Sequence, residues 1–568
     1  MSFEKIKHLL LTVDKPARYI GGEFNAPKVK NNADCKFLMC FPDVYDVALS
    51  NLGIKILYHL LNEKKNVSCE FAFSPWFDME KLMRENGVEL YSLESKTPAK
   101  QFDIIGFSLQ YELSYTNVLF MLDLANIPFR ASERGEEFPL VIGGGPCAVN
   151  PHPISDFFDL FLIGDGEEVL PKLCDEYTKL KNNGTYRKSD FLKIVAGIEG
   201  VFVTSLNQES VKKAQVKDLD KTYFPTKVIL PNLEVVHNRA VLEVFRGCAK
   251  GCRFCQAGFI CRPMRFRKVD TLIDLASRVM SDIGYDEISL SSLSTCDYPH
   301  LKELLEKLKP IADEKKVNIA LPSTRVDSFE SEFIDGARKS SLTFAVEAGT
   351  QRLRDVIQKN ITEENILLSC KKAFESGYSG VKLYFMIGLP TETEEDVKEI
   401  ISLTKKIKWT YKQYATNKKS LRLTVSSSVF VPKPFTPFQR EGQMHLEEVM
   451  KTQNYLKFEL RKLGVKYSYH DAKSSQIEAI LCRSGREMSN VIEDAYRSGC
   501  YFDAWTDKFH YDKWIEALKK NGLDPNELTR ELKGELPWNN ISVGVSQEFL
   551  ENEREKAYKL REEQSESI

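Results

Sequence analysis

The sequence of 568 residues lacks any apolar run of the roughly 18–20 residues that a membrane-spanning helix requires. Its start, MSFEKIKHLLLTV, has only a short apolar stretch and no small-residue cleavage site, which disfavours a signal peptide. Lysine plus arginine number 79 and aspartate plus glutamate 81, so the formal net charge is −2. This balance argues against a protein that coats nucleic acid through bulk charge, although a local basic groove stays open. We therefore expect a cytoplasmic protein without a membrane partner.

The composition, 42% hydrophobic and 28% charged, also disfavours disordered, collagen-like and coiled-coil chains. At about 150 residues per domain, the length predicts three or four domains. The 13 cysteines are spread along the chain, and in a reducing compartment they do not read as a disulfide framework. Most of them are expected to be small buried hydrophobic residues, so the question is which cysteines are not.

Three cysteines are spaced as ligands of one metal centre. Cys248, Cys252 and Cys255 form a C-x3-C-x2-C motif after an apolar, strand-like stretch. Thiolates select iron–sulfur clusters, zinc or Cu(I). A structural zinc site normally has a fourth Cys or His nearby, but Cys261 is awkwardly spaced and no histidine is close. A three-thiolate [4Fe–4S] cluster with one open iron fits better, and a chance grouping of buried cysteines is the alternative.

With Phe254 directly before its last cysteine, the motif resembles the cluster loop of the radical S-adenosylmethionine (SAM) superfamily. That family has a partial barrel of repeated strand–helix units, and the following residues show such units. Strands are predicted at 286–294, 317–323, 342–350, 381–390 and 421–434, with helices at 270–284, 300–316, 363–377 and 394–409. Regular alternation of this kind predicts a parallel sheet, and catalytic groups in such barrels lie at the carboxyl ends of strands.

The resemblance implies roles for residues at the strand ends, beginning with the methionine part of SAM. Ser291 and Ser292 stand where the family often has a Gly-Gly-Glu-like stretch that holds the methionine amino group. Glu347, in a stretch that includes Gly349, would hydrogen-bond the ribose or amino group; an interstrand salt bridge is the alternative. Lys359 matches a basic residue that faces the methionine carboxylate in methylthiotransferase-like members.

The last two strand ends are matched to the adenine part. Gly388 and Pro390 resemble a turn near the adenine, and Pro432 belongs to an apolar strand end that packs on the adenine ring. Just after the cluster motif, the stretch from Arg262 to Lys268 is basic. It could bind an anionic substrate such as RNA, or it could pair with local carboxylates.

The first third of the chain carries strand–helix units of its own, at 36–64, 102–129 and 158–177, with a further strand from residue 139. Such units form an open doubly wound sheet that binds ligands outside the carboxyl ends of its strands. Gly143, Gly144 and Gly145 would let the backbone approach a flat or anionic ligand. No G-x-G-x-x-G fingerprint of a dinucleotide site opens a helix there.

Placed before an iron–sulfur barrel, this unit resembles the cobalamin-binding domain of cobalamin-dependent radical enzymes. Ser108 and Leu109, together with the first two of the three glycines, match positions that cradle the cobalamin tail in that domain. The segment 164–168 resembles the acidic turn before that domain's last helix.

One departure from that domain concerns the lower face of cobalt. The Asp-x-His-x-x-Gly loop, whose histidine replaces the lower cobalt ligand, is absent, and Asp43–Gly53, with Ser50 and Asn51, stands in its place. Two alternatives follow: cobalt without a protein nitrogen below it, or a retained fold that no longer binds cobalamin.

Four regions are predicted: a cobalamin-binding-like Rossmann domain (1–176), a connecting subdomain (177–240), a radical SAM partial (β/α)6 TIM barrel with the [4Fe–4S] cluster (241–440) and a helical carboxyl-terminal cap (441–568). The fold class is therefore α/β, with a doubly wound domain followed by a partial barrel. The whole order resembles an uncharacterised bacterial family of fused radical SAM proteins.

This resemblance implies an enzyme that cleaves SAM to a 5′-deoxyadenosyl radical, with an electron from a flavodoxin- or ferredoxin-type reductant. With cobalamin, the expected reaction is methylation of an unactivated carbon. Radical chemistry without methyl transfer (ring formation, rearrangement or RNA modification) and a non-catalytic iron–sulfur sensor or scaffold are the alternatives. A methylthiotransferase should carry a second three-cysteine motif upstream, which the spacing of Cys35, Cys40 and Cys69 does not provide. The substrate could be RNA, a protein or a small molecule.

Overall fold

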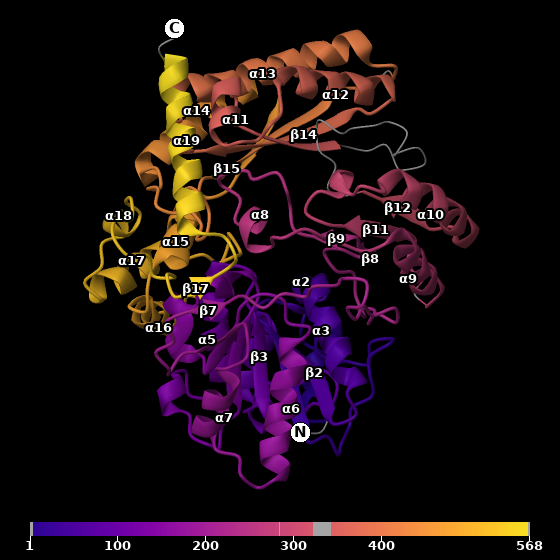
Figure 1. Ribbon diagram of the computed structural model, residues 1–568, viewed down its shortest axis with the longest axis vertical. Helices are drawn as coiled ribbons and strands as arrows, with labels where there is room; N and C mark the ends of the chain where they lie inside the picture. Colours follow the sequence, from indigo (N-terminus) through magenta and orange to yellow (C-terminus); the bar gives the residue numbers. More distant parts are fainter. Residues whose placement is uncertain (1–3, 283, 322–341, 418, 566–568) are drawn as a thin grey trace.

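The computed structural model describes residues 4–282, 284–321, 342–417 and 419–565 (Figure 1). An amino-terminal sheet and a set of barrel strands lie at opposite ends of the molecule, and the short helix α8 (Ala257–Ile260) lies between them. The carboxyl-terminal helices α15 to α17 lie beside this junction (Figure 1). The α/β fold class predicted from the sequence is confirmed. No helix in the described ranges is both long and apolar enough to cross a membrane.

The amino-terminal domain is built on a six-stranded sheet in the order β2-β1-β3-β4-β5-β6. Its strands are β1 (Cys35–Phe41), β2 (Val67–Phe73), β3 (Ile104–Ser108), β4 (Leu140–Gly144), β5 (Leu160–Leu162) and β6 (Val201–Val203). The first five are parallel, and β6 runs antiparallel to β5. Because both faces are covered, the strands are nearly continuous apolar runs, such as CKFLMCF in β1.

Alternate side chains of each strand enter two separate cores. Phe37 and Met39 of β1 pack into the core on one face, and Leu38 and Cys40 pack into the core on the other. The helices of this domain are α1 (Glu4–Leu10), α2 (Tyr45–Ala48), α3 (Leu52–Glu63), α4 (Phe77–Glu85), α5 (Tyr115–Leu124), α6 (Val169–Asn182) and α7 (Lys188–Val195).

The carboxyl-terminal helices share one of these two cores. Side chains of α15 (Ala472–Arg483), α16 (Met488–Arg497) and α17 (Tyr511–Lys520) belong to the same buried cluster as α5 and β3. A short strand, β17 (Ile541–Ser542), also pairs with β7 (Val211–Lys212). The last region therefore packs on the amino-terminal domain as well as on the barrel. Its other helices are α14 (Leu446–Lys462), α18 (Pro525–Leu528) and α19 (Gln547–Ser565).

The barrel half contains the six strands that its sequence pattern predicts, in two parallel sheets. One sheet holds β8 (Ala240–Glu243), β11 (Glu287–Ser291) and β12 (Asn318–Ala320); the other holds β13 (Leu342–Glu347), β14 (Gly380–Ile387) and β15 (Arg422–Val429). Residues 322 and 323 of the third predicted strand lie outside the described residues. The outer helices are α9 (Val269–Asp282), α10 (Leu301–Lys315), α11 (Gln351–Val356), α12 (Glu363–Glu375) and α13 (Glu394–Tyr414).

Two of the expected domain boundaries are displaced. Residue 176 falls inside α6, and β6 belongs to the first sheet, so the amino-terminal domain continues into the segment expected to be a connector. A seventh barrel strand, β16 (Lys466–Tyr469), pairs in parallel with β15, so the barrel sheet continues beyond residue 440. The pairing of β6 with β5 could not be predicted because it joins two separate segments of the chain, and β16 is too short to be distinguished from loop by sequence period alone.

Candidate active site

The three motif cysteines lie on a loop between β9 (Phe245–Arg246) and α8, and all three are partly exposed. None of the 13 cysteines, all within the described ranges, is in a disulfide. Eight of the other ten are buried, as expected for packing residues: Cys35, Cys40, Cys69, Cys147, Cys174, Cys370, Cys482 and Cys500. Accessible thiols are therefore concentrated in the cluster loop and at Cys261 and Cys296.

The cluster loop fits a multinuclear centre. A [4Fe–4S] cluster takes each thiolate at a different iron, so its ligands surround the cluster and do not meet. Gly247 (φ 93°) and Gly251 (φ 71°) adopt the left-handed backbone that turns the loop on both sides of Cys248. Three cysteine thiolates on one tightly turned loop thus suit a [4Fe–4S] cluster.

Arg253, between the second and third cysteines, anchors the loop. Its side chain is 5% exposed, and Nη1 of the guanidinium donates to the carbonyl oxygen of Val356 at 2.7 Å. Nη2 donates to Glu553 of α19 at 3.2 Å, and the backbone N–H of Arg253 donates to Ile357 at 3.0 Å. The loop is therefore tied to the end of α11 and to the last helix of the chain.

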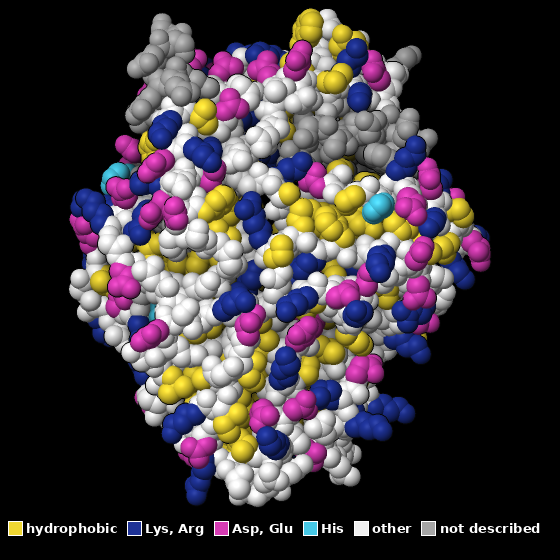
Figure 2. Space-filling view, in the orientation of Figure 1, with side chains coloured by type: hydrophobic (Ala, Val, Ile, Leu, Met, Phe, Trp, Pro, Cys, Tyr) yellow, Lys and Arg dark blue, Asp and Glu magenta, His cyan; other side chains and the backbone are white. Residues whose placement is uncertain are grey.

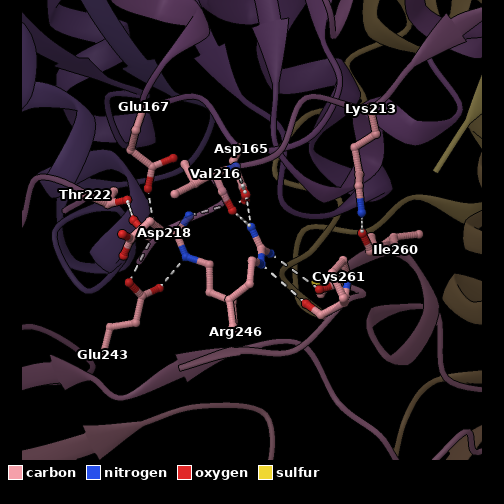
Figure 3. A network of polar contacts seen from close by, with 12 residues as sticks. Asp165, Glu167, Lys213, Val216, Asp218, Thr222, Glu243, Arg246, Ile260 and Cys261 are labelled. Carbon is pink, nitrogen blue, oxygen red and sulfur yellow. Dashed lines mark hydrogen bonds and ion pairs between the residues drawn. The ribbon is translucent and has the colours of Figure 1, made fainter. Parts of the chain in front are cut away.

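A second anchor, Arg246, joins the loop to the amino-terminal domain (Figure 3). Its guanidinium pairs with Glu167, with Asp165 at 3.2 Å and with Glu243 of β8 at 2.7 Å. Glu167 and Asp165 belong to the acidic turn after β5. Burial alone would lower the pKa of Arg246, but the carboxylates of Glu243 and Glu167 more than offset this and raise it, so the arginine stays charged.

Most basic residues after the cluster motif pair with neighbouring carboxylates. Arg265 pairs with Asp165 and donates to the carbonyl of Val216 at 2.9 Å. Arg267 is buried and lies 3.3 Å from a carboxylate oxygen of Glu243, and Lys268 pairs with an aspartate at 3.8 Å. Three of the four basic residues thus pair with local carboxylates, and the fourth, Arg262, lies 4.8 Å from the centre of the Phe259 ring. On the face shown in Figure 2, acidic and basic side chains are interspersed over the amino-terminal half.

Glu347 and Lys359 meet beside the cluster loop. The ammonium of Lys359 donates to Glu347 Oε1 at 3.1 Å, and both side chains are largely buried. Glu347 has φ 69° and sits at a β-bulge between β13 and β14. A glutamate in this conformation is strained, and bulges of this kind redirect a side chain next to a functional site. This salt bridge is not the interstrand one given above as the alternative role of Glu347, because Lys359 lies in the loop after α11 and not on a strand.

This pair also acts electrostatically on Cys255. Burial raises the pKa of the Cys255 thiol, with further increases from Cys248 and Glu347. The N–H of Gly258 and the charge of Lys359 act in the opposite direction. Glu347 and Lys359 therefore lie close enough to Cys255 to act on its thiol electrostatically.

The other strand-end residues fall into two groups. Gly349 is required by packing, because a Cβ there would lie 2.2 Å from the carbonyl oxygen of Asp396. Gly388 (φ 77°) donates its N–H to Glu392 at 2.9 Å and makes the turn that precedes Pro390. The remaining residues lie at or just after strand ends; Ser291 and Ser292 are partly buried, and Pro432 is buried.

A cavity of about 470 Å³ lies at the carboxyl edge of the amino-terminal sheet, between it and the barrel. We call it the amino-terminal cavity. Its walls include Ser108 and the three glycines 143–145, with Asn51 at the start of α3. Glu167, Glu243 and Arg246 of the ionic network, and Cys261 after the cluster loop, complete its barrel side.

This cavity fits the edge of a flat ligand. A Cβ on Gly144 would have only Leu162 at 3.8 Å as a neighbour, so the strand end presents bare backbone to open space. Gly145 has φ 102°, and a Cβ there would lie 2.6 Å from the carbonyl oxygen of Leu109. No histidine is among the described residues that line the cavity. The cavity thus offers shape and backbone contacts without an imidazole.

Three predicted residues of this half have other local roles. Leu109 is fully buried in the core, and only its backbone reaches the strand ends, through an N–H donated to Gly144 at 2.7 Å. The hydroxyl of Ser50 donates to the carbonyl of Asp46, which places it in the helix turn. Asn51 caps α3 by accepting from the N–H of Ile54 at 3.1 Å while it lines the cavity.

A second cavity, of about 660 Å³, lies at the carboxyl ends of β14 and β15. We call it the barrel cavity. Phe254 of the cluster loop lies in its wall beside Met386 and Phe430. Tyr111 comes from the amino-terminal domain, and the segments 469–478 and 503–509 come from the carboxyl-terminal region. All three parts of the chain thus enclose this cavity.

Comparison with family models identifies both halves of the chain. A model of radical SAM proteins, N-terminal, matches residues 53–204, and the model of the radical SAM superfamily matches residues 242–404. An uncharacterised protein of Methanocaldococcus jannaschii is 30% identical over 446 residues, which cover 78% of this chain and 91% of that protein. A tRNA-2-methylthio-N(6)-dimethylallyladenosine synthase of Ehrlichia canis is 22% identical over 367 residues, covering 61% of this chain and 79% of that protein.

Among solved structures, the chain is similar to TsrM from Kitasatospora setae, a radical SAM methyltransferase with cobalamin and a [4Fe–4S] cluster bound. The TM-score is 0.50 at 14% identity, and the match covers 71% of this chain and 74% of TsrM. At this identity the likeness concerns the fold: a Rossmann-like domain joined to an iron–sulfur barrel.

Proposed function

This chain belongs to the radical SAM superfamily, and from that premise we propose that it methylates an unactivated carbon with a cobalamin held in the amino-terminal cavity. The observation that carries the proposal is the position of this cavity. It opens at the carboxyl edge of the first sheet, and residues that flank the cluster loop, Arg246 and Cys261, form its other wall. Ligands of open α/β sheets bind at this edge.

Each cofactor has a matching set of residues. The cluster would be held by Cys248, Cys252 and Cys255, and SAM would lie against Glu347 and Lys359. Cobalamin would lie along Gly143–Gly145 and Ser108. When bound, the cluster and SAM supply an organic radical, and cobalamin supplies a transferable methyl group.

The protein's own residues position these groups and keep water away from them. Arg253 and Arg246 fix the cluster loop from two sides, so its thiols do not need to be ordered when the cluster binds. Lys359 carries the positive charge that attracts a carboxylate, and Glu347 the negative charge that attracts an ammonium. If SAM bound between Lys359 and Glu347, their mutual ion pair would be replaced by two: Lys359 with the SAM carboxylate, and Glu347 with the SAM ammonium. Phe254 and Phe430 present apolar surface to the reacting region, which disfavours water there.

Methyl-labelled SAM tests the proposal. Anaerobically reconstituted protein, supplied with cobalamin and a flavodoxin- or ferredoxin-type reductant, should form 5′-deoxyadenosine and transfer the label to substrate. Cys252→Ala should abolish both products, whereas Cys296→Ala, which removes a partly exposed thiol outside the loop, should retain them. Failure of the protein to bind cobalamin under any condition would contradict the methyl-transfer proposal.

The missing imidazole favours a second candidate, a radical SAM reaction without methyl transfer. Tyr45 and Asp46, within the loop Asp43–Gly53, are committed elsewhere. The Tyr45 hydroxyl donates to Glu23 at 3.0 Å, and Asp46 pairs with Arg18 at 2.7 Å. If this candidate holds, 5′-deoxyadenosine forms without cobalamin and without label in the product.

A further inference from the structure

The barrel cavity adjoins the amino-terminal cavity through shared walls. Gln110 lines the amino-terminal cavity, and the next residue, Tyr111, lines the barrel cavity. The cluster loop and α8 repeat this division, because Phe254 lies in the barrel cavity and Cys261 in the amino-terminal one. A molecule in the barrel cavity would therefore be next to the cluster loop and one chain segment away from the proposed cobalamin.

The only lysine among the described residues that line the barrel cavity, Lys433, is fully engaged by carboxylates. Its ammonium pairs at 2.9 Å with Glu112 and at 2.9 Å with Glu478. Burial alone would lower the pKa of Lys433, but the two carboxylates more than offset this and raise the pKa, so the lysine stays charged. The second oxygen of Glu478 accepts from the Tyr111 hydroxyl at 2.8 Å. One positive charge is thus matched by two negative charges.

Further negative charge and aromatic surface face the same space. Asp471 lies at the exposed rim, and Asp503 lies in the wall with 1% exposure. Burial raises the pKa of Asp503 to about 6, which leaves it mostly ionised at pH 7. Aromatic rings complete the lining: Tyr111, Phe254, Phe430, Tyr469 and Phe509. Three carboxylates and one lysine among the lining residues give a net negative cavity with several ring faces.

We propose that the substrate is a small organic cation, an amine or guanidine, bound in the barrel cavity with its charged group toward Asp471 and Glu478. This rests on the proposed function, because it takes the radical chemistry to occur at this cavity. Carboxylates attract a cation, and aromatic rings add cation–π attraction, whereas both features disfavour phosphate. The volume of about 660 Å³ suits a small molecule. RNA is the less favoured substrate because Arg265, Arg267 and Lys268 are already paired.

A matched pair of probes tests the sign of this preference. Phenethylamine and 3-phenylpropionate share a ring and a two-carbon chain, and differ in the charge of the end group. Their binding to reconstituted, SAM-bound protein is measured by calorimetry at low ionic strength. We expect phenethylamine to bind at least about tenfold more tightly than 3-phenylpropionate.

Substitutions of the lining carboxylates test which residues cause the preference for the amine. Asp471→Asn keeps the cap of α15, since asparagine can accept from the N–H of Ser474 as the aspartate does at 2.9 Å. It should weaken phenethylamine binding about threefold, and adding Glu478→Gln should remove most of the preference. Asp507→Asn is the control, because Asp507 is 69% exposed and is not among the residues of this cavity. It should bind as the wild type does.

Three results would overturn the inference: equal or tighter binding of 3-phenylpropionate, an unchanged preference in the double variant, or no binding of phenethylamine. Formation of 5′-deoxyadenosine by the same preparations separates this test from the proposed function. SAM cleavage without amine preference refutes the substrate class alone. Amine preference without SAM cleavage refutes the radical function and leaves a cation-binding cavity.

Discussion

Replacement of Arg253 by methionine tests how the cluster loop is held. Methionine preserves much of the length and volume of the buried side chain but removes every guanidinium hydrogen bond. The wild-type group donates to Val356, to Asp355 and to Glu553, at 2.7, 3.2 and 3.2 Å. Hydrogen bonds that involve a charged group contribute about 1.5–3 kcal/mol each, and removal of one partner of a buried ion pair costs about 3–5 kcal/mol. Because Glu553 keeps some solvent contact, we expect the lower end, about 3 kcal/mol.

The loss should appear first in the loop and then in cluster retention. We expect faster amide hydrogen exchange at residues 248–255 in the cluster-free protein and less iron per chain after reconstitution. Glu553→Gln should give a smaller effect, and the double variant should be less impaired than the sum of both, because the two residues contact each other. The control is Arg278→Met, which removes an exposed ion pair on α9. Equal exchange and equal iron in Arg253→Met and the control would refute this account of the loop.

Three further predictions concern individual side chains. Lys359→Met should raise the KM for SAM at least about tenfold while the cluster is retained, because one charge-assisted contact is lost; an unchanged KM in steady-state SAM cleavage would count against that role. Gly349→Ala should destabilise the barrel by about 1–3 kcal/mol, since the new Cβ would lie 2.2 Å from Asp396 O. The control is Gly197→Ala, whose Cβ would lie 3.5 Å from its nearest neighbouring atom. Equal midpoints of chemical denaturation for the two variants would contradict the packing argument. Burial raises the pKa of Asp503 from 3.8 to about 6 in the folded protein. Between these two pH values the unfolded chain has already released the proton that the folded protein keeps, so the free energy of unfolding falls as the pH rises, by about 1.4 kcal/mol per pH unit. Asp503→Asn should flatten thermal stability across that window, and a slope equal to that of the wild type would exclude this assignment.

The cluster motif and the barrel strands could be predicted because their signals are local. C-x3-C-x2-C fixes three ligands within eight residues, and the strands 286–294 and 381–390 each lie between two segments with a clear helical pattern. The family resemblance assigned Glu347 and Lys359 to SAM, but the sequence analysis predicted neither their ion pair nor the short helix α11 between them. The strain and the bulge at Glu347 could not be predicted either, since both depend on pairing with β14.

The anchors of the loop could not be predicted, because they join distant parts of the chain. Arg253 meets Glu553 across 300 residues, and Arg246 meets Glu167 across 79. Neither partner has a sequence pattern that distinguishes it from a surface charge. The packing of α5 and α16 into one core could not be predicted either. Both helices have apolar faces, but only the tertiary structure shows which faces are in contact. Arg265 and Arg267 read as a possible anion site for the same reason, since their carboxylates lie far away in sequence or on another strand.

Metal content measured on anaerobically reconstituted protein tests the central claim most directly. The account predicts about four iron atoms per chain, held by the three loop cysteines, together with one cobalt after incubation with cobalamin. Cys252→Ala should lose the iron, and the cobalt should stay because none of the three loop cysteines lines the amino-terminal cavity. Zinc in place of iron would contradict the radical SAM assignment, and iron without cobalt would contradict the cobalamin half of the account.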